Sequence, residues 1–194
     1  MSYLYDDGGR SMGWFTQQEI TEMKNHITAA VYAFAFLEEK PSEKVLPYEI
    51  EDTFYIGMSG GTAFDYTYDC NKGDYFTAFA YRQKYHFRNL TKINDTFDHK
   101  YLPFHEKYLP KINTHKTIFM NVCIPGKSLD PQNVRGYLSV VEQEFIYLYQ
   151  RRWSQPPLLN LAENTTTRKT GSPSSVSGQL REFAAKNNLS EFLS

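Results

Sequence analysis

Two runs of aromatic and β-branched residues constrain the fold of this chain more than any other feature. Residues 28–36 read TAAVYAFAF and residues 50–58 read IEDTFYIGM. Short runs of this composition are typical of buried strands. The segment between them is charged and carries Pro41 and Pro47, which favours a loop. We therefore predict that the two runs pair as an antiparallel hairpin.

The rest of the chain predicts helices around a third strand. Thr16 and Glu19 form a capping box before an amphipathic segment, and Asp130 with Pro131 is a second helix start. In order, we predict a helix from 17 to 27, an amphipathic helix over 75–90, irregular or broken helix over 94–115, a strand over 116–124 and a helix from 130 to about 153. The expected fold class is α/β (α+β), with a small three-stranded, antiparallel or mixed sheet flanked by helices.

The chain length of 194 residues suits one domain with an appendage. We expect an N-terminal helical extension over 1–27 and a main domain over 28–160. Residues 161–194 begin with a polar stretch that is poor in apolar side chains, which indicates a linker. A short amphipathic helix follows it, and a helix of this length needs a docking surface to be stable.

Cysteine content and hydropathy point to an intracellular protein. The two cysteines do not form a CxxC pair, and no apolar run approaches the roughly 20 residues of a membrane span. The N-terminus is polar and acidic, unlike a signal peptide. We expect a cytoplasmic protein without a membrane partner, associated with the nucleoid, or located in the host cell if a phage encodes it.

Charge is distributed unevenly along a chain whose formal net charge is −1. Residues 1–74 hold 5 Lys or Arg and 13 Asp or Glu, whereas residues 82–117 hold 8 and 3. Residues 151–188 are basic again, with 6 Lys or Arg and 2 Asp or Glu. Two basic stretches on a nearly neutral protein predict one face for a polyanion, although two separate solvated surfaces would give the same counts.

Residues able to carry phosphodiester chemistry follow one another along the predicted elements. They are Tyr32 in the first strand, Tyr55-Ile56-Gly57 in the second, Arg82 and His86 on the next helix, Glu142 on the last helix, and Asn160 after it. This order resembles the GIY-YIG nuclease family over roughly residues 28–160. Residues 142–150, EQEFIYLYQ, are similar to the glutamate run of the nuclease domain in bacterial nucleotide-excision repair, and that register selects Glu142 over Glu144.

The resemblance implies a fold, a cofactor and catalytic roles. Glu142 would hold one Mg²⁺, for which Mn²⁺ would substitute, because Mg²⁺ prefers oxygen ligands and retains several waters. Arg82 would neutralise the phosphate with a permanently charged planar fork. Either Tyr32 or Tyr55 would be the general base while the other orients water. His86 would relay a proton or bind phosphate.

The chain departs from the family pattern at two positions. Ala30 stands where the family often has glycine, and Met58 follows the YIG triplet where many members carry a lysine. Lys72 and Lys84 are the candidates to replace that lysine. DNA contacts are expected from basic and amide side chains, namely Lys72, Lys84, Arg88, Lys92, Asn160, Arg151 and Arg152.

Two functions of different classes remain open at this point. The first is a Mg²⁺-dependent DNA endonuclease of restriction-like or mobile-element type, which acts on double-stranded DNA. A homodimer would let one active site per chain cut both strands. The second is a catalytically degenerate domain that binds nucleic acid or a partner, and Met58 together with the acidic first 74 residues favours it.

Overall fold

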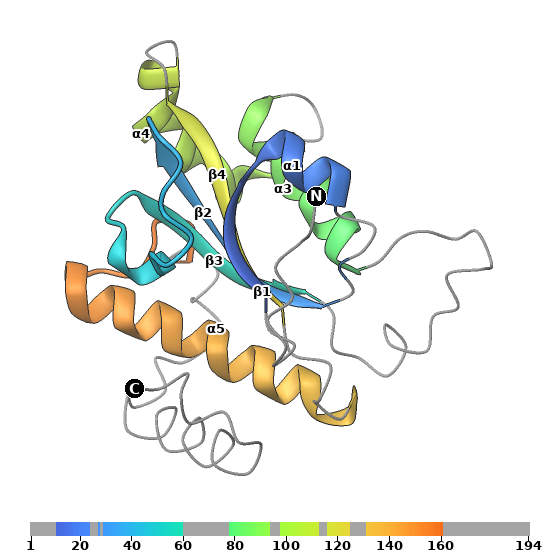
Figure 1. Ribbon diagram of the computed structural model, residues 1–194. Helices are drawn as coiled ribbons and strands as arrows, with labels where there is room; N and C mark the ends of the chain where they lie inside the picture. Colours follow the sequence, from blue (N-terminus) through green and yellow to red (C-terminus); the bar gives the residue numbers. More distant parts are fainter. Residues whose placement is uncertain are drawn as a thin grey trace.

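The protein is built around a four-stranded antiparallel sheet with the strand order β1-β4-β2-β3 (Figure 1). The computed structural model describes residues 11–23, 27, 29–59, 78–93, 98–112, 116–124 and 131–160. The strands are β1 (Ser11–Thr16), β2 (Ala30–Leu37), β3 (Thr53–Ser59) and β4 (Thr117–Ile124). The helices are α1 (Gln17–Met23), α3 (Ala78–Thr91), α4 (Leu102–Ile112) and α5 (Pro131–Trp153), with 3-10 turns η2 (Pro47–Glu49) and η4 (His99–Tyr101).

The predicted antiparallel hairpin is confirmed. β2 and β3 pair with Tyr32 opposite Gly57 and Phe34 opposite Tyr55. The register then shifts, because Ala35 pairs with Thr53 and leaves one extra residue on β3. Such a bulge bends a strand and re-aims its side chains. The extra residue, Phe54, packs in the same aromatic cluster as its neighbour Tyr55.

The prediction of three strands is wrong in number, because β1 adds a fourth along β4. Trp14 lies opposite Asn121 and is buried, and its indole N–H donates to the carbonyl of Val45 at 2.7 Å. These partners are far away in the sequence, so the six-residue stretch before the predicted helix gives little local strand signal. The capping box at Thr16 and Glu19 is confirmed by reciprocal hydrogen bonds of 2.6 and 3.2 Å.

Helices cover both faces of the sheet, and β2 is buried on each (Figure 1). Its alternation sends aromatic side chains to one face and small or β-branched ones to the other, as expected for a pleated strand. The aromatic face packs against α1, α3 and α4 through Tyr32, Phe34 and Phe36. The opposite face packs against α5 through Val31 and Ala33.

The segment predicted as irregular or broken helix contains a regular helix. Residues 99–101 form η4 and continue directly into α4, which includes Pro110. Pro103 lies in the first turn of α4, where a missing backbone N–H costs nothing. No helix in the described part of the chain is long and apolar enough to cross a bilayer. The predicted linker and helix over 161–194 and the loop over 60–74 lie outside the described residues.

Candidate functional site

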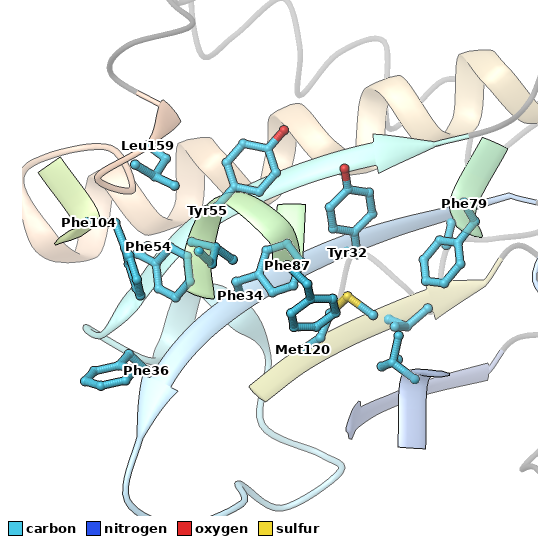
Figure 2. Close-up of a cluster of buried hydrophobic side chains, with 14 of the residues drawn as sticks. Tyr32, Phe34, Phe36, Phe54, Tyr55, Phe79, Phe87, Phe104, Met120 and Leu159 are labelled. Carbon is cyan, nitrogen blue, oxygen red and sulfur yellow. The ribbon is translucent and has the colours of Figure 1, made fainter. Parts of the chain in front are cut away.

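Three of the predicted site residues come together on the aromatic face of the sheet. The Tyr32 hydroxyl lies 2.8 Å from Nε2 of His86, and the Tyr55 ring centroid lies 4.8 Å from that of the histidine. The two tyrosine rings are 6.0 Å apart. Their hydroxyls point to the same side, away from Met120 (Figure 2). The hairpin and α3 therefore assemble a tyrosine–histidine centre.

His86 is almost completely enclosed within this centre. Its side chain is 1% exposed, and a second phenol, that of Tyr101, lies 2.6 Å from its Nδ1. Burial, followed by the positive charges of Lys100 and Arg82, holds the pKa of His86 well below its ordinary value of 6.5. The imidazole is therefore neutral at physiological pH. One ring nitrogen donates a hydrogen bond and the other accepts one.

Gly57 is a glycine because the Tyr55 ring lies across it. A Cβ atom at this position would stand 2.7 Å from the Tyr55 hydroxyl oxygen and 2.8–2.9 Å from two ring carbons. Real Cβ atoms do not approach other heavy atoms this closely. The glycine of the YIG triplet therefore gives the tyrosine of the same triplet the space to lie flat against the strand.

Asn160 holds the free edge of β3. Its Oδ1 accepts from the Ile56 N–H at 2.9 Å, and its Nδ2 donates to the Ile56 carbonyl at 2.7 Å. The backbone N–H of Leu159 donates to the Phe54 carbonyl at 2.8 Å. The segment after α5 thus satisfies an otherwise unpaired strand edge. Asn160 is 4% exposed, so we reassign it from DNA contact to positioning of the YIG strand.

Two residues that sequence reasoning missed, Lys100 and Tyr101, reach the centre from η4. Asp98 caps this turn, since one carboxylate oxygen accepts from the Lys100 backbone N–H at 3.0 Å and the other from the Tyr85 hydroxyl. Asn89 of α3 accepts from the Asp98 N–H at 2.8 Å. The Lys100 ammonium lies 5.2 Å from the Tyr101 ring centroid. No local motif marks this pair, because the turn is defined by its contacts with α3.

The predicted basic residues divide into two groups. Lys84, Arg88 and Lys92 are exposed at four-residue spacing on and just after α3, and Arg82 is exposed one helical turn before His86. Arg151 and Arg152 lie in the last turn of α5. That turn packs near η2, where the Trp153 indole N–H donates to the Tyr48 carbonyl at 3.0 Å. In Figure 1 this end of α5 lies on the opposite side of the molecule from α3. Lys72 lies outside the described residues.

Glu142 is a buried carboxylate, 2% exposed, on the side of α5 that packs toward the sheet. Its neighbours Leu138, Val141 and Phe145 belong to the cluster on the face opposite the tyrosine–histidine centre. Burying a carboxylate among apolar side chains is costly unless a cation or hydrogen bonds compensate. Within the described ranges, no group of three or more His, Cys, Asp or Glu side chains is arranged to hold a metal ion.

β3 is the element that lies between the buried glutamate and the tyrosines. Tyr55 belongs to the aromatic cluster with His86's helix, whereas the next residue, Ile56, belongs to the α5 cluster. α5 contacts both β3 and β2. The outer edge of β3 is covered by Leu159 and Asn160, so β3 and this segment separate Glu142 from the aromatic face.

Compared with family models, curated proteins and solved structures, the chain matches none of them. The nuclease hypothesis therefore depends on the residues themselves and on their placement in this fold.

We predict that Gly57→Ala destabilises the protein through Tyr55. The ring is confined between His86 and Phe34, so it cannot move aside freely. We expect a loss of about 1–3 kcal/mol in the free energy of unfolding, as for other overpacked sites. In a Tyr55→Ala background the same glycine substitution should cost much less. Urea denaturation of the wild type, the two single variants and the double variant measures this coupling. Additive losses in the free energy of unfolding would contradict the close approach of the Tyr55 ring to Gly57.

We predict that the protein loses stability below about pH 6.5 because of His86. The unfolded chain binds a proton at this histidine near pH 6.5, whereas the folded protein, with its lowered pKa, does not. Acid therefore favours the unfolded state and lowers the free energy of unfolding by up to about 1.4 kcal/mol for each pH unit. The clearest window runs from pH 6.5 to about 5.5, above the range in which most carboxylates titrate.

Thermal or urea unfolding as a function of pH checks this dependence. His86→Gln should remove most of the slope in that window, while His99→Gln, at an exposed histidine, should keep it. Equal slopes in the wild type and His86→Gln would show that His86 is not the group responsible.

Proposed function

We propose that this protein is a metal-dependent DNA endonuclease with chemistry of the GIY-YIG type. The observation that carries the proposal is the convergence of Tyr32, Tyr55 and His86. The pKa of the His86 imidazole is low in the free protein, and the negative charge of a bound phosphate would raise it, so that the imidazole could accept the phenol proton. Three residues that resemble a nuclease motif in sequence order thus meet within hydrogen-bond or ring-contact distance.

Tyr32 is the better candidate for the general base. Its ordinary pKa of about 10 is too high for efficient proton abstraction at neutral pH. The hydrogen bond to Nε2 of His86 provides an acceptor for the phenol proton of Tyr32 while the phenol oxygen takes a proton from the attacking water. Tyr55 lies beside the same imidazole, and we assign it the orientation of that water.

Positive charge for the phosphate comes from α3 and η4. Arg82 and Lys100 both act electrostatically on His86, so both lie close to the centre. A guanidinium at this place can neutralise the non-bridging oxygens and stabilise charge that grows in the transition state. Lys84, Arg88 and Lys92 lie on another side of α3 from Arg82 and would contact neighbouring phosphates. In this proposal Lys100 takes the role of the lysine that many members of the family carry at the position of Met58.

Glu142 is the proposed ligand for Mg²⁺ or Mn²⁺. Its burial fits this role, because a cation offsets the cost of an enclosed carboxylate. One carboxylate is sufficient, since Mg²⁺ keeps most of its waters. The metal would supply Lewis acidity and help for the leaving oxygen. In this proposal Glu142 would hold the metal from the α5 side of β3, and the tyrosine–histidine centre would act from the other side.

The proposed substrate is double-stranded DNA, and a restriction-like or mobile-element role fits best. The support is that the described part of the chain holds one set of these site residues beside an exposed basic helix face. A homodimer would place two such sites on the two strands.

We predict that Glu142→Gln abolishes cleavage of supercoiled plasmid DNA while DNA affinity stays within a few-fold of wild type. The rate should fall by at least about 100-fold, because several kcal/mol of transition-state stabilisation are lost. Nicking in Mg²⁺, in Mn²⁺ and in EDTA measures the effect. Glu38→Gln, at an exposed carboxylate on the same protein, serves as the control and should cleave normally. Equal cleavage by Glu142→Gln would refute the metal-ligand assignment.

The burial of the centre favours a second candidate, a degenerate domain that binds DNA or a partner without cutting it. Tyr32 is 1% exposed and Tyr55 is 5% exposed, so both also serve as core residues. The same plasmid experiment separates the two functions. DNA binding without metal-dependent nicking by the wild type would support the binding role.

A further inference from the structure

His86 is held by a second phenol that the proposed reaction does not use. Tyr101 is fully buried, and its hydroxyl lies 2.6 Å from Nδ1, on the opposite side of the imidazole from the Tyr32 contact at Nε2. Both ring nitrogens therefore have a phenol as hydrogen-bond partner.

A neutral imidazole carries one N–H and one lone pair, so the two phenols must play different roles. One phenol accepts from the ring, and the other donates to it. The hydrogen bond at one nitrogen selects the tautomer and so determines what the other nitrogen can do. The contact at Nδ1 thereby controls whether Nε2 presents a lone pair or a proton to Tyr32.

We propose that Tyr101 is a positioning residue that accepts the Nδ1–H of His86 and so keeps the Nε2 lone pair directed at the Tyr32 hydroxyl. This inference rests on the proposed function, in which Tyr32 must lose its phenol proton toward Nε2. The opposite tautomer would present an N–H to Tyr32, and Nε2 could not then accept the phenol proton.

The surroundings of η4 fix the Tyr101 hydroxyl in place. The Tyr101 N–H donates to the Asp98 carbonyl at 3.0 Å, and the Asp98 N–H donates to Asn89 of α3 at 2.8 Å. Asp98 also accepts from Tyr85, which lies on the same helix as His86. The turn that carries Tyr101 is thus tied to the helix that carries the histidine, and supporting contacts of this kind orient functional groups.

The test is the tautomer of His86 in the full-length protein, measured by long-range ¹H–¹⁵N NMR and assigned by loss of the signal in His86→Gln. We expect a protonated Nδ1 and an unprotonated Nε2 in the wild type. In Tyr101→Phe the N–H should move to Nε2, where Tyr32 can accept it, because a buried donor without a partner is poorly tolerated. A protonated Nε2 in the wild type, or an unchanged tautomer in Tyr101→Phe, would overturn the proposal.

Cleavage kinetics provide the second readout. Tyr101→Phe should lower kcat about tenfold with little change in KM, as expected for a residue that orients a catalytic group. The control is Tyr108→Phe on α4, which removes a hydroxyl that donates to Asp52 at 3.2 Å from an equally buried phenol. It should keep both kcat and the tautomer.

Two further outcomes are separable. An equal loss of kcat in both tyrosine variants would reduce Tyr101 to a structural role and overturn the proposal. If the wild type cleaves no DNA, the proposed function fails, and the NMR measurement alone decides whether Tyr101 sets the tautomer.

Discussion

The pairing of β2 with β3 is the constraint on which the candidate site depends. It sets Tyr32 opposite Gly57 and Phe34 opposite Tyr55, so both tyrosines emerge on one face. Gly57 leaves the space that the Tyr55 ring occupies, and Asn160 fixes the outer edge of the same strand through Ile56. A slip of one residue in this register would send the aromatic side chains to the α5 face. The register of the β2–β3 pairing therefore decides whether the two tyrosines can form the centre.

The same residues serve the core and the site. Phe34 lies in ring contact with Tyr32, Tyr55 and His86, so the tyrosine–histidine centre forms one side of the aromatic cluster. Burial gives the centre its electrostatic character, because it keeps His86 neutral beside two cationic side chains. In a water-excluded setting of this kind, hydrogen bonds and charges act more strongly than at the surface.

Sequence reasoning found the parts of this fold that depend on local pattern. The hairpin, the third predicted strand, the capping box and the long last helix follow from alternation and helix-start signals, and the structure confirms them. β1 was missed because its stability comes from β4 and from the contact between Trp14 and Val45. Lys100 and Tyr101 were missed for a similar reason, since the turn that carries them is fixed by long-range contacts with α3. Asn160 was located by motif order, but only its contacts with Ile56 revealed a positioning role.

The most direct test of the account is whether a metal bound by Glu142 lies beside the tyrosine–histidine centre. Mn²⁺ is paramagnetic and broadens the NMR signals of nuclei close to it. Titration of the full-length protein with Mn²⁺ should broaden the ring signals of Tyr32, Tyr55 and His86 before those of Tyr108, and Glu142→Gln should abolish this selectivity. Selective broadening elsewhere in the protein, or the same broadening in Glu142→Gln, would contradict a single site shared by the glutamate and the tyrosines.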